Sequence, residues 1–214
     1  MSAIAEDLLL LAYHDDKGTP LITTAELDIA LTGALLAELA MADRLTVTEK
    51  KLVVVDSAPV GDEELDAVLA RIAGEPKVRK PEWWVNKLNS DKLRKRLLVR
   101  LAERGVLSEE QRKVFGIFAR TSYPERDGSV ERELRQRVQS VLSGAEPDEH
   151  IGLLIAIMHA CKVARKAFPG ADKNRIKEVA EGAWAGEAVR VTIAAINAAV
   201  MSVVLAAVVV TAAS

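Results

Sequence analysis

The residues of this chain best suited to binding chemistry are basic, and they gather in one stretch. Residues 77–104 hold ten Lys or Arg against three Asp or Glu, although the 214-residue chain has a net charge of −2. Residues 1–75 have the opposite balance, with five basic and fifteen acidic residues. Trp83 and Trp84 precede the densest basic part and are interpreted as one core ring and one rim ring. This polarity predicts a surface of positive potential that attracts lipid phosphates, nucleic acid or an acidic partner.

One of these cations, Arg94, lies where an apolar side chain is expected. At about 100° per residue, the leucines of the helix predicted for residues 91–104 form one apolar stripe: Leu93, Leu97, Leu98 and Leu101. Arg94 falls inside this stripe, where an unpaired guanidinium is costly. Either it forms a structural salt bridge or snorkels to the rim, or it lies in a pocket and binds an anion such as phosphate. The other cations of the helix fall outside the stripe and are expected to be solvated: Lys92, Lys95, Arg96 and Arg100.

The residue types that catalyse reactions or bind metals are scattered along the chain. The three histidines, His14, His150 and His159, are not spaced as zinc ligands with one another or with Cys161. His159 and Cys161 are two residues apart in an apolar helix and point to different sides, which disfavours a Cys–His catalytic pair. His159 is therefore expected in the core. No glycine-rich phosphate loop follows a strand. We expect no catalytic residues, no metal site and no cofactor.

The composition is that of a globular chain with a sizeable core. Half of the residues are apolar, which excludes wholesale disorder, and the length suits one large domain or two small ones. The single cysteine, Cys161, favours a reducing compartment. Residues 1–13 carry Glu6 and Asp7 where a signal peptide would be positive. We expect a cytoplasmic protein in which residues 1–214 form a single domain.

Helices are the elements that must position the basic stretch. Thr23 and Glu26 have the spacing of a capping box, and Ser90 is the expected cap of the helix that carries Arg94. Apolar periodicity predicts helices over residues 2–13, 24–41, 61–72, 82–88, 91–104, 130–142, 148–168, 172–183 and about 187–211. The other predicted elements are β-hairpins over residues 45–55 and 114–123 and one short helical turn over 108–113.

The last 24 residues, 191–214, contain no charged side chain and are long enough to cross a bilayer. A helix that is apolar all round is buried either in protein or in lipid. Its small alanines and Asn197 favour a central core helix, and a membrane anchor is the alternative. The expected fold is mainly α: a single compact helical domain around a buried apolar C-terminal helix, with one or two small β-hairpins.

Several short segments, taken in order, resemble the Golgi phosphoprotein 3 family of phosphoinositide effectors. They are residues 6–11, 35–40 with Arg44-Leu45, 58–62 with Leu65-Asp66, 94–97 with 103–107, and 155–160. Together they span nearly the whole chain. The composition, rich in Ala, Val and Arg, is typical of a bacterial member.

The resemblance implies a helical, non-catalytic peripheral membrane protein whose last apolar helix is buried. In eukaryotic members, phosphatidylinositol 4-phosphate binds a basic pocket, a nearby apolar hairpin contacts the bilayer or mediates association, and Golgi glycosyltransferases are retained through the vesicle coat. The family's pocket positions fall here on Thr23, Thr32, Asp91 and Arg94, and Arg94 alone keeps the family's arginine. Asp91 would repel a phosphate. The hairpin matches by position and keeps three apolar residues: Phe115, Ile117 and Phe118.

The expected function is therefore non-catalytic binding of acidic membrane lipids, with weak selectivity for phosphatidylinositol 4-phosphate. Protein partners, or self-association through the hairpin, are compatible with this role. Three alternatives stay open: a protein-interaction scaffold without lipid preference, a winged-helix nucleic-acid binder, and a tail-anchored protein. Nucleic acid is disfavoured because the helix before the 45–55 hairpin carries acids such as Glu26, Asp28 and Glu38 and almost no cations.

Overall fold

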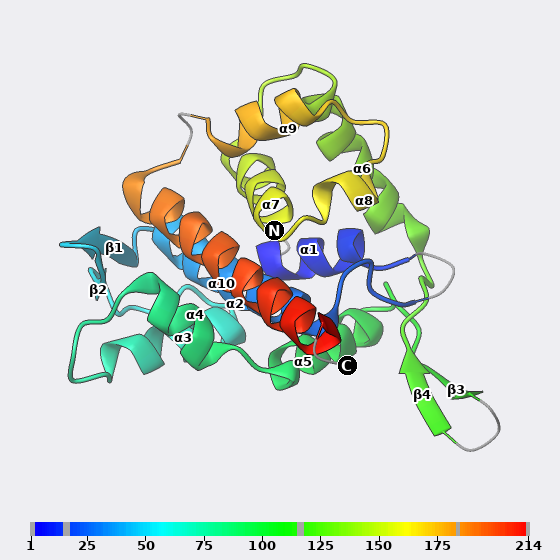
Figure 1. Cartoon of the computed structure of the whole chain (residues 1–214), viewed down its shortest axis with the longest axis horizontal. Helices are drawn as coiled ribbons and strands as arrows, with labels where there is room; N and C mark the ends of the chain where they lie inside the picture. The colour runs from blue at the N-terminus through cyan, green and yellow to red at the C-terminus, as the bar shows by residue number, and fades with distance from the viewer. Residues whose placement is uncertain (1–2, 15–17, 115–117, 183–184, 213–214) are drawn as a thin grey trace.

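The computed structural model describes residues 3–14, 18–114, 118–182 and 185–212. Within these ranges the chain forms ten helices and two two-stranded antiparallel sheets (Figure 1). The helices are α1 (Ile4–Ala12), α2 (Thr24–Met41), α3 (Glu63–Ala73), α4 (Pro81–Leu88), α5 (Asp91–Glu103), α6 (Gly128–Leu142), α7 (Glu149–Ala160), α8 (Ala164–Ala167), α9 (Lys173–Ala180) and α10 (Glu187–Ala212). The strands are β1 (Leu45–Thr48), β2 (Lys51–Val54), β3 (Glu110–Val114) and β4 (Phe118–Ser122). The mainly α class with small hairpins is confirmed.

The core is built around α2 and α10, which lie side by side through the middle of the molecule (Figure 1). The predicted capping box starts α2, since the Thr23 side chain accepts from the Glu26 backbone N–H and Glu26 bonds back to Thr23. Gly33 of α2 allows the close approach of α10, because a Cβ there would lie 2.1 Å from Ile196 Cγ1. Buried side chains continue along α10 to Val200, so this part is the predicted core helix. Among the described residues, none of the helices combines the length and apolarity needed to span a membrane.

The tryptophan pair divides between core and rim as predicted. Trp84 of α4 is 2% exposed, whereas Trp83 is partly buried. The two rings pack edge to face with centroids 4.8 Å apart. The guanidinium of Arg79 lies 4.7 Å from the Trp83 centroid, a cation–π contact at the edge of the basic stretch.

The two hairpins differ in how well the sequence predicted them. β1 and β2 pair in register Leu45 with Val54 to Thr48 with Lys51, within the predicted 45–55 segment. β3 pairs with β4, from Glu110 with Ser122 to Val114 with Phe118. The short helical turn predicted for residues 108–113 is therefore wrong. These residues are extended because the backbone of β4 needs a paired strand to satisfy its hydrogen bonds. Phe115 and Ile117 lie outside the described residues, and only the backbone of Phe118 is described, as the start of β4.

The helix predicted for residues 148–168 is interrupted. α7 ends at Ala160, Lys162 adopts φ of 62°, and the short α8 follows from Ala164. Non-glycine residues rarely enter this left-handed region except in turns. His159, at the end of α7, is exposed, so its predicted place in the core is wrong. The neighbouring residues Met158, Ala160 and Cys161 stay buried, so His159 lies on the one side of this last turn that faces solvent.

Candidate anion-binding site

Arg94 is held on α5 against an acid of α2. Helix α5 starts as predicted, with the Ser90 hydroxyl accepting from the Lys92 N–H at 3.2 Å. One turn further, Arg94 Nε donates to Asp28 Oδ1 at 2.6 Å, and the two side chains are 14% and 10% exposed. Burial opposes the charge of Arg94, but the hydrogen bond and charge of Asp28 prevail and raise the pKa of Arg94. The salt-bridge interpretation of Arg94 is confirmed.

Arg94 also lines a pocket, and the interpretation that it binds an anion there stays a prediction. The pocket has a volume of about 420 Å³ and is bounded by Tyr13 at the end of α1, Thr24 of α2, Arg94 and Lys95 of α5, and Tyr123 after β4. Burial raises the pKa of the Tyr13 phenol, and the neighbouring Arg94 guanidinium acts in the opposite direction. Tyrosine hydroxyls and a guanidinium are the donors that a phosphate oxygen would meet here.

A close backbone contact joins this pocket to the β3–β4 hairpin. Gly18 has φ of 56°, and a Cβ there would lie 2.5 Å from the backbone N of Pro124. The loop between α1 and α2 therefore packs directly on the residues that follow β4. As a result Gly18, Thr121 and Tyr123 all line the pocket that contains Arg94. The pocket opens at the base of the hairpin.

The other three positions taken from the family pocket do not line the pocket of Arg94. Thr23 is exposed and serves as the cap of α2. Asp91 is exposed and pairs with Lys95 Nζ at 2.6 Å, which lowers the pKa of Asp91. Thr32 is 1% exposed and borders a different pocket. Of the four predicted residues, Arg94 alone borders the cavity at the hairpin base.

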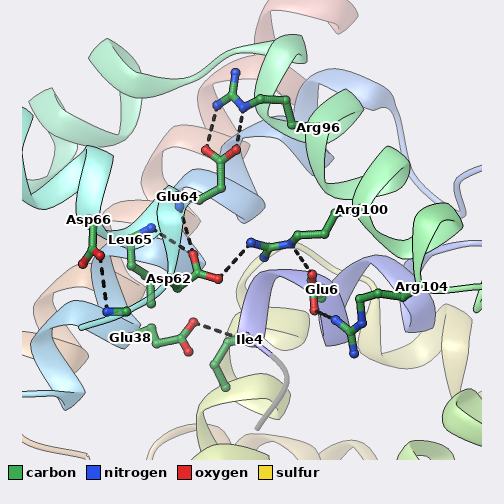
Figure 2. A network of polar contacts seen from close by, with 11 residues as sticks. Ile4, Glu6, Glu38, Asp62, Glu64, Leu65, Asp66, Arg96, Arg100 and Arg104 are labelled. Carbon is green, nitrogen blue, oxygen red and sulfur yellow. Dashed lines mark hydrogen bonds and ion pairs between the residues drawn. The ribbon is translucent and has the colours of Figure 1, made fainter. Parts of the chain in front are cut away.

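Most of the remaining arginines of the basic stretch are bound to acids from the first 75 residues, as Figure 2 shows. Arg100 donates to both Glu6 and Asp62, and Arg104 donates to Glu6 at 2.6 Å. Arg96 forms a bidentate ion pair with Glu64, in which Arg96 Nη2 donates to Glu64 Oε2 at 2.7 Å. The prediction that Arg100 is an ordinary solvated residue is wrong, because it bridges two acids and is 27% exposed. Ion pairs inside the fold therefore neutralise most of the arginine charge of the basic stretch.

Sequence reasoning missed the partner of Arg94 and the two tyrosines that line its pocket. Asp28 was assigned only to an acidic helix face, yet it lies on a buried helix between Leu27 and Ile29. One acid and one arginine, each on an otherwise apolar helix, is the signal that could have paired Asp28 with Arg94. Tyr13 and Tyr123 carried no comparable signal, because turns bring them to the pocket.

The histidines, cysteine and acids of the described chain form no metal cluster. Among the residues that the structure describes, no group of three or more His, Cys, Asp or Glu side chains could hold a metal ion. His150 Nε2 lies 2.7 Å from Asp7 Oδ2, a pair that joins α7 to α1. Cys161 is fully buried, which raises its thiol pKa to about 12. A thiol of this kind is a packing residue rather than a nucleophile.

The fold and site thus define a mainly α protein with an arginine pocket at the base of a β-hairpin. Comparison with known proteins gives the family: the model described as Golgi phosphoprotein 3 (GPP34) matches residues 4–196. The chain belongs to the GPP34 family, as its motifs predicted. It is also similar to vacuolar protein sorting-associated protein 74 of Eremothecium gossypii, with 27% identity over 161 residues, 65% of this chain and 48% of that protein. The chain spans about half the length of this curated relative.

Proposed function

We propose that this protein associates with membranes as a non-catalytic peripheral protein that binds anionic lipid head groups, phosphatidylinositol 4-phosphate among them, in the pocket beside Arg94. The observation that carries the proposal is the position of this pocket. Arg94 and Lys95 share it with Thr121 and Tyr123 at the base of the hairpin. A head group bound to the cations would lie next to the element that the family resemblance assigns to the bilayer.

The salt bridge to Asp28 gives Arg94 a fixed orientation. It engages Nε, and a guanidinium carries four further N–H donors in a rigid fork. A fixed fork loses little conformational freedom when it binds a phosphate. The same bridge neutralises part of the positive charge, and Asp91 adds a nearby negative charge. We therefore propose weak selectivity among inositides, with general attraction to acidic lipids.

The test is vesicle flotation with phosphatidylcholine vesicles that contain phosphatidylinositol 4-phosphate, phosphatidylglycerol or no acidic lipid. Arg94→Ala alone would strand the buried Asp28 charge and endanger the fold. The informative variant is therefore Asp28→Asn combined with Arg94→Gln, which removes both charges and leaves the net charge unchanged. Lys177→Gln on α9, an exposed lysine far from the pocket in sequence, serves as the control.

The double variant should lose most of its flotation with both acidic lipids, while Lys177→Gln floats like the wild type. Added salt should weaken wild-type binding, because exposed charges are screened within about 10 Å at 0.1 M. Equal flotation of the double variant and the wild type would remove the Arg94 pocket from lipid binding. A wild type that ignores all three vesicles would leave the protein-interaction scaffold as the better function.

A further inference from the structure

A second pocket lies on the other side of α5 from the cavity at the hairpin base. It has a volume of about 430 Å³ and is bounded by α2, α3, the end of α4 and the start of α5. Its volume falls within the range of about 300–1,000 Å³ that is common for small-molecule sites. Four cations border it, together with one acid: Arg71, Lys87, Lys92, Arg96 and Glu64.

Among the described residues, three of these cations form no ion pair, although the charge of Lys92 acts on the exposed Asp91 and Lys87 Nζ lies 5.9 Å from the Trp83 ring centroid. Glu64 is buried and binds Arg96 through both of its oxygens, so these two charges cancel. Arg71, Lys87 and Lys92 are exposed at the pocket wall. Throughout the described ranges of the chain, none of the three forms an ion pair. The pocket therefore carries a net positive charge that the fold does not neutralise, unlike the region around Arg94.

The pocket also contains a buried polar group with no partner. Thr32 is 1% exposed, and its Oγ1 makes no hydrogen bond to any described residue. A buried hydroxyl without a partner is destabilising, so such groups are rare unless a ligand or water completes them. The pocket is also bordered by Ser90 and Lys92 at the N-terminus of the 13-residue α5. Its helix dipole adds favourable potential for an anion.

We propose that this pocket is a phosphate-monoester site, in which Lys87, Lys92 and Arg71 bind the anionic oxygens and the Thr32 hydroxyl supplies a hydrogen bond from its floor. A phosphate monoester fits because it carries close to two negative charges and three acceptor oxygens, which three unpaired cations can match. The site is separate from the Arg94 pocket and does not depend on the proposed membrane role. A soluble phosphorylated compound and a phosphate-monoester lipid head group share this chemistry.

The test is an NMR titration of the full chain with inorganic phosphate, followed through the backbone amides of Ser90 and Lys92. Lys87→Gln combined with Lys92→Gln removes two exposed lysines of the pocket. Lys77→Gln combined with Lys80→Gln is the matched control, because it removes two exposed lysines of the same basic stretch that do not border the pocket. Thr32→Val, which preserves shape, removes the hydroxyl alone.

The pocket pair should weaken phosphate binding at least tenfold, and the control pair should change it less than twofold. Thr32→Val should weaken it about fivefold, the factor that one hydrogen bond of about 1 kcal/mol gives. The absence of saturable shifts in the wild type would overturn the proposal. So would equal losses in the pocket pair and the control pair, since these would indicate diffuse surface charge.

Flotation with phosphatidic acid, a monoester lipid, and phosphatidylglycerol, a diester, separates the two sources. If the pocket pair loses flotation selectively on phosphatidic acid, the ligand is a lipid head group. If it loses phosphate binding but floats normally, the ligand is a soluble phosphate compound. Both results keep the site. In the Asp28→Asn, Arg94→Gln variant, inorganic phosphate should still shift the Ser90 and Lys92 amides as in the wild type, so failure at Arg94 is distinguishable from failure here.

Discussion

Glu38 offers the sharpest test of the energetics of this fold. Its carboxylate, on α2, accepts a hydrogen bond from the Ile4 backbone N–H at 3.0 Å (Figure 2). Helix α1 has no cap from its own preceding side chain, Ala3, so Glu38 satisfies one of the free N–H groups at its start. Burial raises the pKa of Glu38 from 4.5 to about 7, and Ile4 and His150 oppose the shift. Ionised Glu38 is thus costly in the folded state.

The sign of the pH dependence follows from this pKa. The unfolded chain releases the proton near pH 4.5, whereas the folded protein retains it until about pH 7. Between these values the folded state binds more protons, so the free energy of unfolding falls as pH rises. Each pKa unit corresponds to about 1.36 kcal/mol, which makes the full loss on the order of 3 kcal/mol. Above pH 7 the loss is complete, and below pH 4.5 it is absent.

Glu38→Gln should remove this dependence, because the amide oxygen can still accept from Ile4 but cannot ionise. Urea unfolding of both proteins at a series of pH values between 5 and 8 measures the difference. We expect the variant to gain about 1–3 kcal/mol over the wild type by pH 8 and less than about 1 kcal/mol at pH 5. The charged neighbours of Glu38, Asp7, Asp62 and His150, are the same in both proteins. A difference that stays constant with pH, or that favours the wild type at pH 8, would refute the reasoning.

Three further predictions concern packing and buried groups. Gly33→Ala should lower the free energy of unfolding by about 1–3 kcal/mol in urea, because the added methyl meets Ile196; Gly170→Ala, which meets nothing within 4 Å, should change it little. Thr32→Val should raise the free energy of unfolding by about 1 kcal/mol, since it removes a buried hydroxyl without a partner; a destabilised variant would mean that the hydroxyl is bonded. The Cys161 thiol is fully buried and has a pKa of about 12, so it should not react with a thiol reagent at pH 8 until urea unfolds the chain. Rapid labelling of the folded protein would contradict its burial.

Local features of the fold were predictable, because their causes lie within a few residues of one another. The Thr23–Glu26 capping box and the Ser90 cap placed the starts of α2 and α5. The helical period of apolar residues predicted a helix over residues 24–41, and α2 has these same bounds. The break after α7 was missed because Lys162, which turns the chain, is neither Gly nor Pro. A left-handed lysine gives no signal in a sequence.

The candidate site was predictable only in part, because its partners are distant in the chain. The position of Arg94 on an apolar stripe indicated a buried partner or ligand, and the structure contains both a partner and a cavity. The partner, Asp28, is 66 residues away in the sequence, and sequence spacing does not predict contacts between residues so far apart. The bond from Arg100 to Glu6 spans 94 residues. Such pairs depend on how helices pack, which the apolar pattern of each helix does not specify.

The pairing also changes what the basic stretch can do. Counted along the sequence, its formal excess of positive charge suggests a strongly anion-attracting surface. In the fold, however, the acids of the first 75 residues bind Arg79, Arg94, Arg96, Arg100 and Arg104. Within the described chain, the lysines of the stretch at positions 77, 80, 87 and 92 form no ion pair. The arginines thus hold helices together, and these four lysines are the cations of the stretch that remain available to attract anions. Since Lys87 and Lys92 of this set border the Thr32 pocket, the proposed phosphate site depends on lysines rather than on the paired arginines.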